Sequence, residues 1–123
     1  MVGEATRLPL EDGSVDAAFA NMVLHHVEHP TAMLREMARV VRPGGRVAIT
    51  DEVEHPYAWM REEHADVWLG FGRRQVEHFF AVAGLSEGYG YEALGMQCCI
   101  HSTTSGEVAD IGIFAAWGTV PRR

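Results

Sequence analysis

Histidine is the residue type in this sequence with the widest range of chemistry, and three histidines cluster at His25, His26 and His29. An imidazole titrates near neutral pH, so one of them is a candidate general base. Imidazoles also bind metals, but the spacing HHxxH on a loop is not an established pattern of metal ligands. Packing within the loop is the third interpretation. We predict no metal on these histidines, and we keep His25 and His26 as candidate catalytic residues.

A pair of adjacent cysteines, Cys98 and Cys99, stands close to His101. Vicinal thiols beside an imidazole can bind a soft metal or trivalent arsenic. The sequence holds only these two cysteines, and a free cysteine is commonly a small buried hydrophobic residue. The soft-ligand interpretation and the packing interpretation both remain open. We expect no disulfide, because neighbouring cysteines can close only a strained ring.

The residues around the histidines predict a strand followed by a helix. Residues 15–20 are small and apolar apart from Asp16, as in a strand buried on both faces. Pro30 suits the first helical position, where its missing N–H costs nothing. Apolar residues then recur at helical spacing as far as Val41. The histidines therefore lie on a loop between a strand and a helix.

A Pro-Gly-Gly sequence predicts where this helix ends and a second strand begins. Pro43 cannot continue the helix, and Gly44 and Gly45 provide positive-φ positions for the exit turn. Residues 47–50 then form the next strand. Two strands joined by a helix make a right-handed unit with parallel strands. The carboxyl end of the first strand, near the histidines, is the edge where ligands bind in such sheets.

The rest of the chain predicts two helices and an antiparallel pair of strands. The helices are expected over 57–68 and 73–83, and the strands over 88–96 and 110–119. Trp59 and Trp68 either contact an acceptor or pack the first of these helices onto the sheet. Gly84 is suited to end the second helix, because glycine adopts the left-handed conformation found there.

Composition excludes some classes of function. The chain has 123 residues, enough for one domain or part of one. A net charge of −7 argues against a nucleic-acid surface. We find no apolar run near the ~20 residues of a membrane span. The first residues lack the basic region and long apolar core of a signal peptide, so we expect a cytoplasmic protein.

Several of these motifs, taken in order, resemble the second half of a class I S-adenosylmethionine-dependent methyltransferase. The similarity is to the ubiquinone/menaquinone and arsenite methyltransferase-like group. It covers the first half of the chain closely and residues 70–85 more loosely. The matching residues are Gly3-Glu4-Ala5, Leu8-Pro9-Leu10, Asp12-Gly13-Ser14-Val15-Asp16, Leu24-His25-His26, the helix over 34–41 and Arg42-Pro43-Gly44-Gly45.

The resemblance implies a fold, a cofactor and some site residues. It implies an α/β fold with strands in the family order 4-5-7-6, the last strand in sequence being antiparallel, and helices packed on the sheet. It implies S-adenosylmethionine as cofactor, with Glu4 and Ala5 beside the adenine and Asn21 beside the methionine part. The family usually has Asp where Glu4 stands. The residues near His25 would face a small-molecule acceptor.

The family's glycine-rich loop, Gly-x-Gly-x-Gly, does not occur in this sequence. We therefore interpret residues 1–123 as a single partial domain, the C-terminal half of the fold. The implied function is methyl transfer once the missing N-terminal half completes the site. Alternatives are a non-catalytic half-domain for oligomerisation or partner binding, and a thiol-based metalloid-binding module. Because the strand over 15–20 would lack its first neighbour, we expect a homo-oligomer formed through that exposed edge.

Overall fold

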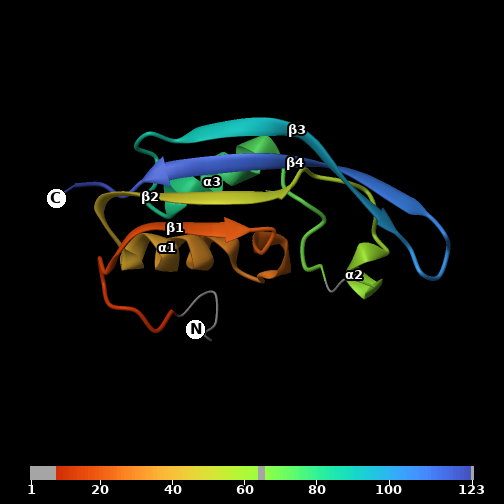
Figure 1. Cartoon of the computed structure of the whole chain (residues 1–123), viewed down its shortest axis with the longest axis horizontal. Helices are drawn as coiled ribbons and strands as arrows, with labels where there is room; N and C mark the ends of the chain where they lie inside the picture. Colours follow the sequence, from red (N-terminus) through yellow and green to blue (C-terminus); the bar gives the residue numbers. More distant parts are fainter. Residues whose placement is uncertain (1–7, 64–65, 123) are drawn as a thin grey trace.

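The structure, a computed structural model, describes residues 8–63 and 66–122 and has a four-stranded sheet at its centre (Figure 1). The spatial order is β1-β2-β4-β3. β1 runs parallel to β2, and β4 runs antiparallel to both of its neighbours. This confirms the predicted α/β fold and the family order 4-5-7-6. The strands are β1 (Val15–Asn21), β2 (Val41–Glu52), β3 (Gly90–His101) and β4 (Val108–Thr119).

Local sequence explains the two longer helices, α1 (Pro30–Val40) and α3 (Arg73–Val82). Pro30 occupies the first turn of α1, as predicted. Gly72 is the N-cap of α3, and its N–H donates to the Gln75 side chain at 3.3 Å. Gly84, with φ of +80°, ends α3 in the left-handed conformation. Two short helices, η1 (Leu24–His26) and α2 (Met60–Glu63), lie in the connections.

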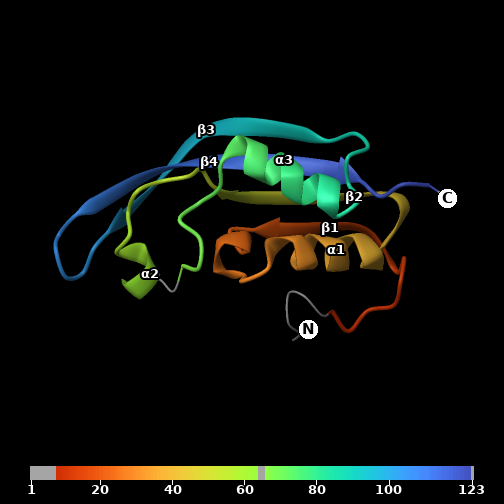
Figure 2. The ribbon, with the colours of Figure 1, turned by 180° about the vertical axis from the view of Figure 1, so that it is seen from behind.

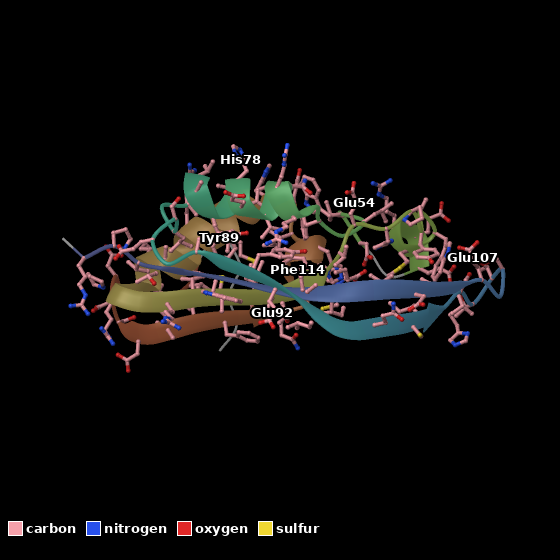
Figure 3. The ribbon with its side chains drawn as sticks, turned by 90° about the horizontal axis from the view of Figure 1, so that it is seen from above. Glu54, His78, Tyr89, Glu92, Glu107 and Phe114 are labelled. Carbon is pink, nitrogen blue, oxygen red and sulfur yellow. The ribbon has the colours of Figure 1, made fainter. Side chains whose placement is uncertain are left out.

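Both longer helices pack on the same face of the sheet (Figures 2 and 3). Their apolar faces enclose one core, and Phe114 of β4 lies between the sheet and the helices in Figure 3. The opposite face has no helix over it among the described residues. There the Phe19 side chain remains 63% exposed. The core includes Leu34, Met37, Val47, Ile49, Val76, Phe80 and Phe114.

The exit from α1 differs from the predicted turn. β2 begins at Val41, directly after the helix, and its register to β1 shifts between Val15 and Ala17. Gly44 has a φ of +85°, but Gly45 does not have a positive φ. The physical role of Gly45 is close approach, because a Cβ there would lie 2.4 Å from the Asp16 carbonyl oxygen.

Two predicted boundaries were wrong. Among the described residues of the helix expected over 57–68, the helical ones are Met60–Glu63. Beyond residues 64–65, the backbone N–H groups of Val67 and Trp68 both donate to the His25 carbonyl oxygen, at 3.0 Å, instead of to a helical turn. The hairpin strands are longer than predicted, because β3 passes a register shift between Ala93 and Gln97 and continues to His101.

No helix in the described parts of the chain combines the length and the apolar character that a membrane crossing requires.

A buried histidine–carboxylate cluster at the carboxyl ends of β1 and β2

A sharp turn after β1 brings the predicted histidines back over the sheet. Met22 follows the last residue of the strand with φ of +59°, a conformation that costs a residue with a side chain about 1–2 kcal/mol. Its N–H donates to the Thr50 carbonyl oxygen at 2.9 Å, which fixes the turn against β2. The short helix η1 follows, and both Leu24 and His25 are buried in it. His25 therefore lies over the carboxyl end of β2.

Asp51, the buried penultimate residue of β2, holds His25 by two groups. Its Oδ2 accepts the backbone N–H of His25 at 3.2 Å, and its Oδ1 lies 2.6 Å from His25 Nδ1. Oδ1 also accepts the backbone N–H of Glu52 at 2.7 Å. Because this oxygen is an acceptor, the hydrogen belongs to Nδ1 of the ring. The other ring nitrogen, Nε2, faces away from Asp51 and into the rest of the cluster.

Two further buried carboxyl groups surround Nε2. Glu52 Oε1 lies 3.1 Å from His25 Nε2, and Asp66 Oδ1 lies 3.6 Å from the same atom. A second buried histidine, His55, places its Nε2 at 3.1 Å from Glu52 Oε2. The Nδ1 of His55 accepts the backbone N–H of Tyr57 at 3.3 Å. The segment that carries Asp66 is fixed to η1 by the two hydrogen bonds to the His25 carbonyl oxygen.

The cluster shifts the pKa values of its members in directions with clear causes. Burial alone would lower the pKa of His25, but the hydrogen bond to Asp51 and the negative charges of Asp51, Glu52 and Asp66 together raise it. Burial raises the pKa of Glu52 to about 7, although the charge of His25 opposes that effect. Burial lowers the pKa of His55. These shifts favour a charged His25 and the neutral forms of Glu52 and His55.

A cavity of about 240 Å³ opens onto the cluster. His26 lies at its wall with its side chain 43% exposed, and its ring centroid is 4.0 Å from that of His25. A larger cavity, about 560 Å³, lies at the amino ends of β1 and β2 near Gly13 and Val41. We regard the smaller cavity as the candidate site because buried ionisable side chains face it. Its lining residues are Met22, His25, His26, Glu52, Met60, Asp66 and Ile100.

The other residues singled out in the sequence lie elsewhere. His29 is exposed at the N-cap of α1, so the structure separates it from the other two histidines. Asn21 is exposed at the carboxyl end of β1, where its Oδ1 accepts the Thr50 hydroxyl. Glu4 and Ala5 lie outside the described residues.

Cys98 and Cys99 are successive residues of β3, not part of a loop. Cys99 is exposed, and its Sγ lies 3.9 Å from Asp110 Oδ1. Within the described residues, the groups of side chains spaced to hold a metal ion consist of histidines and carboxylates, without a cysteine.

Trp68 is a packing residue in this structure. Its indole N–H donates to the Val27 carbonyl oxygen at 2.9 Å, and its ring lies against Phe71 and Phe79. Of the two interpretations given by the sequence, packing therefore describes Trp68. It fixes the segment after α2 over η1, which helps to hold the cluster closed.

Comparison with known proteins connects this edge of the sheet to a family. A family model described as a methyltransferase domain matches residues 1–49. The demethylmenaquinone methyltransferase of Beutenbergia cavernae is 45% identical over 58 residues, which are 47% of this chain and 24% of that protein. The corresponding protein of Mycolicibacterium gilvum is 49% identical over 51 residues, 42% of this chain and 22% of that protein.

The match to the family model ends within β2, but the similarity in fold continues through the remaining strands. A chain from the complex of the Haloferax volcanii Trm112 methyltransferase activator with a methyltransferase superposes with a TM-score of 0.76. The superposition covers 99% of this chain and 61% of that one, at 18% identity. The chain thus resembles methyltransferases in sequence over its first part and in fold over nearly its whole length.

A further solved methyltransferase has a similar fold. Phosphoethanolamine N-methyltransferase 2 of Haemonchus contortus, solved with S-adenosyl-L-methionine, superposes with a TM-score of 0.71. It is 12% identical, and the superposition covers 97% of this chain and 36% of that one. The chain thus matches about a quarter of the length of these two curated relatives.

Proposed function

We propose that this chain provides the acceptor end of a site for methyl transfer from S-adenosylmethionine to a small molecule. The observation that carries the proposal is the position of the cavity at the carboxyl ends of two parallel strands. That edge is where open α/β sheets bind ligands. His25 and His26 line this cavity and are the candidate catalytic side chains. The names of the menaquinone-pathway relatives support the same reaction class.

Asn21 fits the methionine end of the proposed cofactor. It is exposed at the carboxyl end of β1, and the Thr50 hydroxyl fixes its amide oxygen. S-adenosylmethionine supplies an electrophilic methyl group on a positively charged sulfur. An attacking atom needs chiefly to be held in line with that methyl group, so positioning is the main demand on the protein. Glu4 and Ala5 remain proposed contacts of the adenine.

We propose that only the reacting end of the acceptor molecule enters the cavity at the cluster. Ligand pockets for complete small molecules usually hold about 300–1,000 Å³. The cavity at the cluster measures about 240 Å³. The remaining contacts with cofactor and acceptor would then come from residues outside this chain. We accordingly propose that residues 1–123 are one part of a methyltransferase domain, whose glycine-rich loop is not in this sequence.

Calorimetry with S-adenosylmethionine tests this proposal. The chain alone should bind the cofactor more weakly than micromolar affinity. The chain fused behind the part of the Beutenbergia cavernae relative that precedes its matching region should bind it saturably. In that fusion, Asn21→Ala should weaken binding, whereas His29→Ala, a matched exposed control, should not. A folded fusion without cofactor binding would contradict the proposal, as would tight binding by the isolated chain.

A second proposal concerns assembly, because β1 is an edge strand that pairs only with β2 in the described sheet. We propose that β1 (Val15–Asn21) pairs with β1 of a second copy, which would bury Phe19. Unprotected edges favour such pairing, and lysine on the edge prevents it. Light scattering after size exclusion should report a dimer or larger species, and Phe19→Lys should yield a monomer. A monomeric wild-type chain at high concentration would contradict this proposal.

A further inference from the structure

Carboxylate oxygens of Glu52 and Asp66 each lie near His25 Nε2, at separations like those between two ligands of one metal ion. We propose that His25 Nε2, Glu52 and Asp66 form a binding site for a divalent cation of the zinc class. Glu52 Oε1 and Asp66 Oδ1 lie 3.1 and 3.6 Å from His25 Nε2. Tetrahedral ligands with metal bonds of about 2.0–2.2 Å are separated from one another by about 3.4 Å. The two observed separations lie on either side of that value.

The imidazole of His25 is held in the tautomer that a metal requires. Its Nδ1 carries the hydrogen and donates it to Asp51 at 2.6 Å. Nε2 therefore presents its lone pair to Glu52 and Asp66. Metal-binding histidines usually donate their second N–H to a carboxylate in this way, which orients the ring and makes it a stronger ligand. Asp51 is thus a positioning residue for the proposed site, not a ligand.

The Glu52 carboxyl group provides an independent reason to expect a cation. The residue is only 1% exposed, and its Oε2 has no hydrogen-bond partner in the described structure. A buried carboxylate oxygen without a hydrogen bond is costly unless a proton or a cation satisfies it. His55 Nε2 lies 3.1 Å from this oxygen but is not aligned as a hydrogen bond. A metal bound between Glu52, Asp66 and His25 would satisfy the group.

The cavity leaves a coordination position open. Three protein ligands with one open position are typical of catalytic zinc sites, whereas structural sites have four protein ligands. The open position would face the cavity wall formed by Met22, His26 and Ile100. If the proposed methyltransferase function holds, a hydroxyl oxygen of the acceptor would fill this position, and the cation would lower the pKa of that hydroxyl.

Metal binding by the isolated chain tests the proposed metal site without any methyl transfer. A chain that binds no metal would therefore refute the metal site and leave the proposed methyltransferase function untouched. The chain, freed of metal by a chelator and dialysed, should bind one Zn²⁺ in competition with a chromophoric chelator. Co²⁺ in the same site should give the visible absorption of a tetrahedral complex. Glu52→Gln should abolish or greatly weaken binding, because it replaces a ligand with a neutral group of the same shape.

Three further variants separate this site from other sources of zinc binding. Asp51→Asn should weaken zinc binding by roughly 10–100-fold, the usual effect of losing the group that orients a ligand. His29→Gln, at an exposed histidine outside the cluster, should bind like the wild type. The double variant Cys98→Ser, Cys99→Ser should also bind zinc unchanged. The proposal is overturned if the wild type binds no zinc, or if binding survives Glu52→Gln and disappears in the cysteine variant.

Discussion

Asp51→Asn should destabilise the chain measurably, because the carboxylate satisfies three buried donors with two oxygens. Oδ1 accepts from His25 Nδ1 and from the Glu52 N–H, and Oδ2 accepts from the His25 N–H. An asparagine has only one acceptor oxygen. The asparagine amide loses less if its oxygen takes the position of Oδ1, which accepts two hydrogen bonds. Its NH₂ group then takes the position of Oδ2 and faces the backbone N–H of His25. One buried N–H is then left facing another donor.

The expected magnitude follows from that count. A buried donor without a partner costs about 1–3 kcal/mol. Hydrogen bonds to a charged acceptor are also roughly twice as strong as neutral ones, so the two remaining bonds weaken by about 1 kcal/mol in total. We therefore expect Asp51→Asn to lower the free energy of unfolding by roughly 2–4 kcal/mol. Urea unfolding followed by tryptophan fluorescence, with a chelator present, measures this change through the midpoint at constant slope.

Asp16→Asn is the matched control, because Asp16 is the other aspartate of this parallel strand pair that has a partner. Its carboxylate accepts a hydrogen bond from Arg42 Nε at 3.0 Å, but the Asp16 side chain is 91% exposed. Exposed ion pairs contribute about 0–1 kcal/mol. Asp16→Asn should thus stay close to the wild type. If the two variants lose equal stability, or if Asp51→Asn loses none, the proposed role of Asp51 in holding His25 is refuted.

Two further predictions concern the glycines near the start of β2 and the Glu63 carboxylate of α2. Gly44→Val should lower the free energy of unfolding by about 1–3 kcal/mol through strain at its positive φ. Gly45→Val should lower it further because its Cβ would meet the Asp16 carbonyl oxygen; unchanged melting temperatures for both would refute these roles. Hydrogen bonds from Ser102 and Thr103 lower the pKa of Glu63 from 4.5 to about 2. Because the pKa of Glu63 is lower in the folded chain, its hydrogen bonds should stabilise the fold above about pH 4.5, and this stabilisation should be lost as the pH falls towards 2. Glu63→Gln should remove that part of the acid dependence, as measured by urea unfolding.

Much of the fold is predictable because local sequence and packing agree over the first half of the chain. Pro30, the apolar spacing of α1 and the Pro-Gly-Gly sequence all indicate the same strand–helix–strand unit, and the structure has it. The prediction of a long helix over 57–68 was wrong for a physical reason. Backbone N–H groups in this region find an acceptor in His25, far away in the sequence, and no helical periodicity can reveal that competition.

The candidate site was only partly predictable. The sequence predicted His25 and His26 at the ligand-binding edge of the sheet, but the acidic pair Asp51 and Glu52, which ends the next strand, was not singled out. The approach of Asp66 was not predictable, because a long connection with only a short helix places it. The histidines of the HHxxH motif do not stay together in the structure, because His29 lies apart at the N-cap of α1. His25 is the buried histidine of that motif, and carboxylates from other segments surround it.

The central claim is that the carboxyl ends of β1 and β2 form one end of a methyltransferase site, and amide NMR tests it most directly. Millimolar S-adenosylmethionine should be added to the isotope-labelled chain and the backbone amides followed. The account predicts shift changes in Asn21, Met22 and Thr50, which lie together at that edge. Shifts confined to Gly13 and Gly84, at the cavity on the opposite edge, would contradict the claim, as would an unchanged spectrum.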